Sequence, residues 1–329
     1  MQTYIRELLR ELVGVVDADL EAAVQSDAVG ELPDGITPRR FPVAAGVRRA
    51  IAALRMPGQF NLVHGLDAAV PLRPAVPSVA TFHDLAVFDV PWTYSRRRVA
   101  GKRLQTWHAA RTADVIIAVS SFTAERVRDR LHRDSVVIPE APPPDCAPPA
   151  AETVDDVRQR YALPDRFVLS VGSLEPRKGI EGLAGACKQA GVSLLHAGAV
   201  SSRAGQRLAA RMLGYVPRRD LIALYGAATL VAFPSHYEGF GLPPLEAMAC
   251  GAPVVTTPVG SLRELLGDTA VFVPVGDTVR LAGAIRDLCD DDGRRTELSV
   301  AGPARVTQLR WDDAARATAA VYRSLGIAV

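Results

Sequence analysis

Short apolar runs alternate with longer amphipathic stretches over most of the chain. The runs are rich in Val, Ile, Leu, Ala and Phe, which is typical of parallel strands buried on both faces. They are residues 60–63, 78–82 and 114–120 in the first half, and 166–172, 193–198, 230–233 and 253–256 in the second. After the third run, Ser120 stands where a helix N-cap is expected. Strands and helices that alternate at this spacing predict an α/β fold of two doubly wound units.

A proline-rich segment separates the two halves. Six prolines lie between Pro139 and Pro149, and a stretch so rich in proline cannot form a central strand or a helix interior. The length of 329 residues also suits two domains of about 150 residues each. We therefore expect a first domain over residues 1–145, a second over 146–310, and a final helix over 311–329 that could cross back to the first domain.

Composition and charge argue against several classes of protein. The formal net charge of +2 is too small for a nucleic-acid-binding protein. No apolar run reaches the ~20 residues that span a bilayer. The four cysteines are far apart and form no Cys-x-x-Cys pair, so neither a zinc site nor a disulfide framework is expected. Reduced thiols indicate a cytoplasmic protein.

The densest candidate chemistry lies in the segment that contains Glu238 and Glu246. Gly239 and Gly241 break the loop that carries Glu238, so backbone amides can come close to a ligand. Pro243 and Pro244 are typical of the first turn of a helix, and we expect Glu246 to project from that helix N-terminus, which attracts phosphate. Carboxylates accept hydrogen bonds from sugar and ribose hydroxyls, so this segment predicts a polyol-phosphate site. The alternative is a surface loop followed by an ordinary amphipathic helix.

A second candidate follows the strand at 166–171. Gly172 ends the strand, and Arg177 and Lys178 come shortly after it. An arginine can grip a diphosphate through a forked pair of bonds, and a lysine adds a point charge. The alternative is a solvated surface pair. No Gly-x-Gly-x-x-Gly follows a strand, which argues against a nicotinamide dehydrogenase.

The first half carries two weaker candidates. His83 and Asp84 follow the strand at 78–82, and a histidine there could bond to a sugar; His64 follows the strand at 60–63. The alternative for these residues is a structural role. Residues 92–111 hold six Lys or Arg, two Trp and no acid, so they could rest on anionic lipid; a solvated helix edge is the alternative.

The segment 237–246, with Ala232-Phe-Pro-Ser235 before it and Gly251-Ala-Pro-Val-Val255 after it, resembles the Glu-x7-Glu motif of retaining glycosyltransferases. These are enzymes of the glycosyl transferases group 1, or family four, type. Thr81-Phe-His-Asp-Leu85 and Gly172-Ser-Leu-Glu-Pro-Arg-Lys178 are similar to further elements of that family, and the resemblance covers about residues 4–322. It implies the GT-B fold, in which two Rossmann-like domains face a cleft.

The resemblance also implies roles for individual residues. The donor diphosphate would lie on Gly172, Arg177 and Lys178, and the nucleobase on the loop Gly214, Tyr215 and Val216. Glu238, Phe240, Gly241 and Leu242 would hold the sugar, Glu246 the ribose, and His83 the transferred sugar or the acceptor. No metal and no cofactor other than the nucleotide-sugar co-substrate is implied. Glu238 and His83 are the expected catalytic residues.

The implied reaction is transfer of a sugar from a nucleoside diphosphate sugar to a hydroxyl group on a glycan, a lipid-linked or a small-molecule acceptor. The His-Asp-Leu and Glu-Pro-Arg-Lys elements are similar to the mannosyltransferase branch, which implies GDP-mannose as donor. A non-catalytic nucleotide-sugar-binding or partner protein of the same fold is the alternative.

The sequence departs from the family pattern at three places. In the family, a buried strand and a glycine-rich turn precede the helix that begins here at Tyr4, so we expect the first domain to lack its first strand. Residues 138–142 read Ile-Pro-Glu-Ala-Pro where the family usually has an Asn-Gly turn. Gly179 stands where many relatives have Asn.

Overall fold

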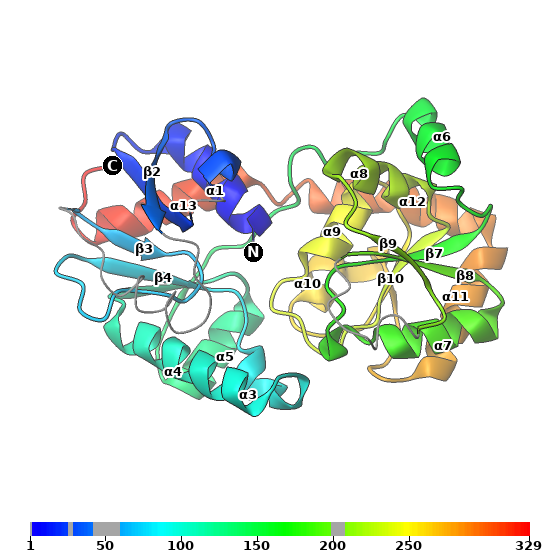
Figure 1. The fold of residues 1–329 in the computed structure, drawn as a ribbon, viewed down its shortest axis with the longest axis horizontal. Coiled ribbons are helices and arrows are strands. Elements are labelled where there is room, and N and C mark those ends of the chain that lie inside the picture. Colours follow the sequence, from blue (N-terminus) through cyan, green and yellow to red (C-terminus); the bar gives the residue numbers. More distant parts are fainter. Residues whose placement is uncertain (1, 26–28, 42–59, 199–207) are drawn as a thin grey trace. The chain divides into compact units, whose positions relative to one another are not determined.

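The computed structural model describes residues 2–25, 29–41, 60–198 and 208–329. The chain forms two compact units, Met1–Glu140 with Leu309–Val329, and Ala141–Gln308 (Figure 1). The boundary between them lies inside the proline-rich segment. Each unit is built around its own parallel sheet, which confirms the predicted α/β class with two Rossmann-like units.

The first unit has a four-stranded parallel sheet in the order β3-β4-β5-β6. Its strands are β3 (Val63–Gly65), β4 (Ser78–Phe82), β5 (Val115–Ala118) and β6 (Val136–Val137). All five residues of the predicted strand β4 are buried, including Ser78 and Thr81. A separate parallel pair, β1 (Leu20–Gln25) and β2 (Ile36–Phe41), was not predicted. Among the described residues β1 and β2 pair only with each other.

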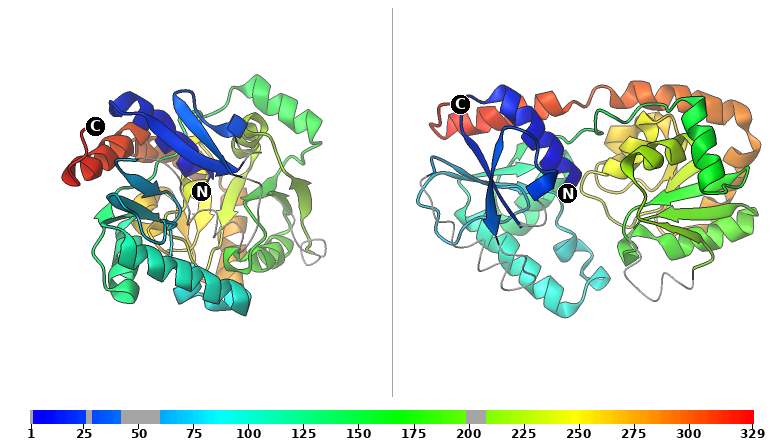
Figure 2. Two further views of the ribbon diagram at one scale, coloured as in Figure 1. Left: turned by 60° about the vertical axis from the view of Figure 1, so that its left-hand side comes forward. Right: turned by 45° about the horizontal axis from the view of Figure 1, so that its top comes forward.

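Helices cover both faces of this sheet (Figures 1 and 2). They are α1 (Gln2–Val15), α3 (Ala86–Asp89), α4 (Arg96–Thr112), α5 (Ser121–Leu131) and α13 (Trp311–Ser324), with short 3-10 helices η1 (Val29–Glu31) and η2 (Pro91–Thr93). In α1, buried Tyr4, Leu8 and Leu12 recur every four residues and so form one face, and α1 packs on α13. The N-cap predicted at Ser120 is confirmed: its hydroxyl accepts the Thr123 N–H at 3.0 Å.

The second unit has a six-stranded parallel sheet in the order β12-β11-β10-β7-β8-β9. The strands are β7 (Phe167–Val171), β8 (Ser193–Ala197), β9 (Arg211–Gly214), β10 (Leu230–Phe233), β11 (Val254–Thr256) and β12 (Val271–Phe272). The sequence predicted β7, β8, β10 and β11 and missed β9 and β12. Chain order runs outward in both directions from β7, so the connection reverses between β7 and β10.

Helices also cover both faces of the second sheet. They are α6 (Ala151–Arg160), α7 (Ile180–Ala190), α8 (Arg218–Ala227), α9 (Leu242–Ala249), α10 (Leu262–Leu266), α11 (Thr278–Asp290) and α12 (Asp292–Val306), with 3-10 helices η3 (Pro176–Lys178) and η5 (Gly267–Thr269). On one face α7 packs on α11, and Val168, Leu183 and Ile285 share a core there. Helix α9 packs on α8 and α12 on the other face (Figure 1). No helix in the described part of the chain is long and apolar enough to span a membrane.

Candidate active site

The candidate donor site lies where the second sheet reverses its connection. In doubly wound sheets ligands bind at the carboxyl ends of the strands at this switch point. Strands β7 and β10 are hydrogen-bonded neighbours there, and the segments that follow them carry the two motifs singled out from the sequence. The main-chain N–H of His236 donates to the carbonyl of Arg177 at 2.7 Å, so the two segments are tied together.

Glu238 is the hydrogen-bond acceptor at the centre of this site. The side chain is buried, and Oε1 accepts hydrogen bonds from Lys178 Nζ at 2.6 Å and from Ser235 Oγ at 2.7 Å. Oε2 accepts from Arg177 Nη1 at 3.3 Å, and Arg177 Nε also donates to Glu175 at 2.7 Å. Burial opposes the charge of Glu238, but Lys178 and Arg177 outweigh it and lower the pKa of the carboxyl. The structure therefore brings together the predicted acid and both predicted cations.

Gly179 explains one departure from the family pattern. It has φ 67°, in the left-handed region, where glycine and asparagine are the residues best tolerated. A Cβ at this position would lie 2.3 Å from the carbonyl oxygen of Pro234. Glycine thus lets η3, which carries Arg177 and Lys178, pass close to the segment after β10.

A second close approach supports the loop around Glu238, and sequence reasoning missed it. A Cβ on Gly260 would lie 2.0 Å from the carbonyl oxygen of Glu238. The neighbouring Ser261 Oγ donates to the carbonyls of Gly239 at 3.1 Å and Phe240 at 2.9 Å. The segment at 260–261 therefore fixes the backbone that carries Glu238. The sequence offered a signal in Gly260, which is separated by three residues from the apolar run at 253–256.

The position expected for Glu246 was wrong. Helix α9 begins at Leu242, with Gly241 as N-cap at φ 99°, so Glu246 is the fifth residue of the helix and its first turn has no acid. Because Pro243 and Pro244 lack an N–H, Leu242 is the only one of the first three helical residues with a donor to offer. Phe240, Gly241 and Leu242 thus form the approach to the helix N-terminus.

Glu246 is buried against polar partners that the sequence did not predict. Oε1 accepts from Arg218 Nη1 at 3.0 Å, and Oε2 accepts from the Tyr225 hydroxyl at 3.2 Å. Burial raises the pKa of Glu246 against the attraction of Arg218. Arg218 also binds Asp145 of the proline-rich segment at 2.9 Å, so it links that segment to α8 and α9. Nothing local in the sequence pairs these four residues.

Glycines also mark the carboxyl ends of β7, β8 and β9. Gly172 has φ 131° and donates its N–H to Ala197 at 3.0 Å, while the Gly198 N–H donates to the carbonyl of Gly214 at 2.8 Å. A Cβ on Gly198 would lie 1.8 Å from the Gly172 carbonyl oxygen. In the predicted nucleobase loop Tyr215 is 87% exposed, whereas Val216 is buried. Gly172 and the start of that loop therefore lie along one edge of the sheet.

In the first unit, His83 follows β4 and both of its ring nitrogens are engaged. Nδ1 lies 2.9 Å from Glu140 Oε1, and Nε2 lies 2.9 Å from the carbonyl oxygen of Leu66. Asp84 caps α3 by accepting the Ala86 N–H at 2.9 Å, which is a structural role. Glu140 was not singled out from the sequence, although it lies in the segment that departs from the family pattern.

His64 is held in a buried polar cluster. Nδ1 lies 2.7 Å from the Tyr322 hydroxyl, and Nε2 lies 2.8 Å from Thr81 Oγ1. Burial, together with the nearby His83, lowers the pKa of His64 to about 3, so its ring is neutral. This arrangement fits the structural alternative for His64.

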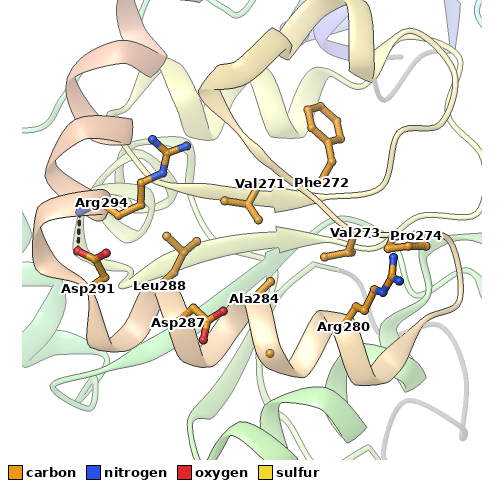
Figure 3. Close-up of a pocket in the computed structure, with 11 residues that line it drawn as sticks. Val271, Phe272, Val273, Pro274, Arg280, Ala284, Asp287, Leu288, Asp291 and Arg294 are labelled. Atoms are coloured by element: carbon orange, nitrogen blue, oxygen red, sulfur yellow. Dashed lines mark hydrogen bonds between the residues drawn. The ribbon is translucent and has the colours of Figure 1, made fainter.

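A shallow hollow lies between β12 and the helices α11 and α12 (Figure 3). None of the predicted site residues line it; its lining residues include Phe272, Arg280, Asp287 and Arg294. Among the described residues, no group of three or more His, Cys, Asp or Glu side chains is placed to hold a metal ion.

Comparisons with known proteins agree with this geometry. Residues 154–305 match the family described as Glycosyl transferases group 1, and residues 1–141 match Glycosyltransferase Family 4. The O-antigen chain mannosyltransferase B of Escherichia coli is 32% identical over 295 residues, which cover 81% of this chain and 73% of that protein. The D-inositol 3-phosphate glycosyltransferase of Xylanimonas cellulosilytica is 33% identical over 323 residues, covering 84% and 75%.

The fold comparison covers nearly the whole chain. The sucrose-phosphate synthase from Thermosynechococcus elongatus superposes with a TM-score of 0.79 at 23% identity, over 98% of this chain and 92% of that one. The two family matches fall on the two units, and the relatives span both of them. The resemblance drawn from residues 237–246 is thereby confirmed. The chain belongs to the family 4, or group 1, glycosyltransferases, which are retaining GT-B hexosyltransferases that take their sugar from a nucleotide sugar.

Proposed function

We propose that the protein transfers a mannose-type sugar from GDP-mannose to a hydroxyl acceptor, with retention of the anomeric configuration. The observation that carries the proposal is the cluster of Lys178, Arg177 and Glu238 at the switch point of the second sheet. Similarity to a mannosyltransferase over 81% of the chain supports the choice of sugar.

Arg177 and Lys178 bind the donor diphosphate in this proposal. Both side chains are 14% exposed and lie next to the approach to α9, whose N-terminal dipole also favours an anion. Both already bond to Glu238, so the diphosphate shares these cations with the carboxylate. Their attraction grows as negative charge develops on the leaving group, which favours the transition state over the bound donor. At Gly172, which has no side chain, the diphosphate can come close to the backbone.

The two acids hold different parts of the donor. Glu238 lies in the glycine-flanked loop and faces the sugar, whose hydroxyls also meet the backbone of Phe240, Gly241 and Leu242. Glu246 binds the ribose. Each oxygen of Glu246 accepts one hydrogen bond within the protein, and a carboxylate offers about four acceptor positions in all. The remaining positions can accept the two ribose hydroxyls, and the loop at Gly214, Tyr215 and Val216 takes the base.

The transfer step requires no metal and no covalent intermediate on the protein. The bond between the sugar and the diphosphate oxygen breaks, and the acceptor oxygen bonds to the same face of the sugar carbon. The proton of the acceptor hydroxyl moves to the leaving phosphate oxygen. Glu238 stabilises the positive charge that develops on the sugar ring, and His83 donates a hydrogen bond on the acceptor side.

The acceptor and the cell compartment form the last part of the proposal. On α4 and the turn before it, Trp92 is 62% exposed, Leu104 70% and Trp107 46%, beside Arg97 and other basic residues. An apolar and cationic surface of this kind fits an anionic membrane, which supports a lipid-linked acceptor. The cysteines are free thiols, in agreement with a cytoplasmic protein that works at the inner membrane face.

Steady-state assays of the full chain test the proposal. GDP-mannose, UDP-glucose and UDP-N-acetylglucosamine are each offered with a panel of glycan and polyprenyl acceptors, and the anomer of the product is read by NMR. We expect turnover with GDP-mannose and retention. Lys178→Ala should abolish it, while Lys188→Ala, which removes an exposed lysine of α7, should not.

Three results would reject the proposal. Inversion of the anomer, or turnover of a UDP-sugar alone, would contradict the mechanism or the donor. Tight nucleotide binding with no turnover of any donor would favour the alternative, a non-catalytic nucleotide-sugar-binding or partner protein of this fold.

A further inference from the structure

His83 makes hydrogen bonds that constrain where its hydrogens are. The carbonyl oxygen of Leu66 can only accept, so Nε2, at 2.9 Å, must carry a hydrogen. Nδ1 faces the carboxyl of Glu140 at 2.9 Å. A carboxyl group normally loses its proton near pH 4.3 and an imidazole near 6.5, so the shared proton belongs on the ring. Both ring nitrogens then carry a hydrogen, and the ring is a cation.

We propose that Glu140 is a positioning residue that holds His83 as a doubly protonated imidazolium and fixes the direction of its Nε2–H. The inference deepens the proposed function, on which its catalytic part rests. The protonation state itself rests only on the contacts within the first unit.

The groups around His83 leave Glu140 as the ionised partner. Among the described residues, Tyr4 of α1 meets the ring edge-on with centroids 4.6 Å apart, and His64 of β3 is the other nearby imidazole. Burial raises the pKa of Tyr4, so its hydroxyl stays neutral and bonds to Thr81 at 3.1 Å. His64 is neutral as well. Burial opposes the charge of His83, but the hydrogen bond and charge of Glu140 outweigh it and raise the pKa of the ring.

The backbone that leads into Glu140 is held in place. The Ile138 N–H donates to the carbonyl of Ala118 at 2.9 Å, and the ring of Pro139 fixes its own φ and restricts Ile138 before it. Glu140 is 4% exposed, and a carboxylate so buried needs a charged partner to offset its desolvation. His83 is that partner in the described structure. Thr123 Oγ1 donates to the His83 carbonyl at 3.3 Å, so the backbone of His83 is also fixed.

An imidazolium has a definite role in the transfer. It has no free lone pair and so cannot remove the acceptor proton, which agrees with a step in which the leaving phosphate takes that proton. Its Nε2–H can be shared between Leu66 and a substrate oxygen. Glu140→Gln keeps the shape of the side chain but removes its charge. The pKa of His83 should therefore fall in this variant, so that the ring loses its second proton at a lower pH than in the parent.

NMR of the full-length protein labelled with ¹⁵N-histidine tests the protonation state without any turnover. The chain has six histidines, and the His83 signals are assigned by their loss in His83→Gln. We expect both nitrogens of His83 to carry hydrogen at pH 7.5. In Glu140→Gln, the midpoint of the His83 titration should fall by at least one pH unit. Glu140→Asp should recover part of the shift, and Glu125→Gln, an exposed acid of α5, should leave it unchanged.

The kinetic arm asks whether the charge matters for catalysis. In Glu140→Gln, kcat/KM should fall at least tenfold at pH 8 but little at pH 6, so that the alkaline limb moves to lower pH. A neutral His83 in the parent at pH 7.5, or an unchanged titration in Glu140→Gln, would overturn the inference. If Glu140→Gln does not fold, the parent spectrum alone decides. If no donor is turned over, the proposed function fails while the NMR result still stands.

Discussion

Replacing Glu238 by Gln should change donor binding and turnover in opposite directions. The carboxylate accepts from Lys178 at 2.6 Å and from Arg177 at 3.3 Å, and it competes with the diphosphate for both cations. Glutamine keeps the shape and one acceptor oxygen but loses the charge. The positive charges of Lys178 and Arg177 are then less compensated within the protein, and the diphosphate can compensate them instead.

The magnitudes follow from the kinds of bond involved. A hydrogen bond to a charged group contributes about 1.5–3 kcal/mol, and the amide oxygen retains part of it, so GDP should bind tighter by about 1 kcal/mol, or about fivefold. Loss of a preorganised charge beside the reacting sugar typically costs about 10²–10³ in kcat. Removing one member of a buried ion pair also costs up to roughly 3–5 kcal/mol of folding stability. Arg177 keeps its ion pair with Glu175, so the loss of folding stability should lie at or below the lower end of that range.

Calorimetric titration with GDP and steady-state kinetics with GDP-mannose measure the two effects on one preparation. Glu175→Gln is the matched control, because it removes a more exposed partner of Arg177, 29% exposed, outside the glycine-flanked loop. A partly exposed pair of this kind contributes about 1 kcal/mol or less, so both parameters should change by less than about fivefold. If Glu238→Gln weakens GDP binding, or changes only KM, the arrangement argued for the carboxylate is wrong.

The remaining predictions concern single groups. Arg177→Ala should weaken GDP binding at least tenfold by calorimetry, because a charge-assisted bond to phosphate is lost; unchanged affinity would remove Arg177 from the site. Turnover should survive EDTA, and a rate that collapses and returns with Mn²⁺ would contradict a metal-free transfer. Trp107→Ala should reduce co-sedimentation with anionic vesicles, because an exposed aromatic ring is lost from the membrane-facing surface; unchanged co-sedimentation would argue against that surface. The pKa of His83 is raised in the fold, so the His83–Glu140 pair contributes its full stability below pH ~6.5 and loses it as the pH rises through the raised pKa. The melting temperature should therefore decline more from pH 6 to pH 9 in the parent than in Glu140→Gln. Parallel plots of melting temperature against pH for the two proteins would contradict this.

Strands buried on both faces could be predicted because most of their residues are apolar. All residues of β4 and β10 are buried, and both were predicted with their observed bounds. The missed strands lack that signal. In β1 burial alternates only partly, β6 has two exposed residues, and β9 is partly exposed along its length. Their pairing depends on neighbouring strands rather than on their own composition.

Site residues could be predicted where they stand in one short segment, and not where the fold brings distant segments together. Glu238 and Lys178 were found because each lies in a strand-end loop with glycines. Arg218 and Glu140 have no local pattern that ties them to Glu246 and His83, from which they are separated by 28 and 57 residues. The position of Glu246 was wrong because the helix begins at Leu242, one residue before the prolines used to locate it.

The charge balance of the donor-side cluster shows why its geometry matters more than its net charge. The hydrogen-bonded groups are four carboxylates and three cations: Asp145, Glu175, Glu238 and Glu246 with Arg177, Lys178 and Arg218. Their sum is slightly negative, so a diphosphate gains nothing from long-range attraction to this group as a whole. It must instead take over particular hydrogen bonds that the carboxylates now receive, within reach of the α9 N-terminus. Arg218 is engaged by Glu246 and Asp145, and Glu175 contacts Arg177, whereas Glu238 contacts both Arg177 and Lys178 and so competes most directly with the donor. That competition makes Glu238→Gln informative, since relief of it strengthens binding while loss of the charge beside the sugar slows the transfer.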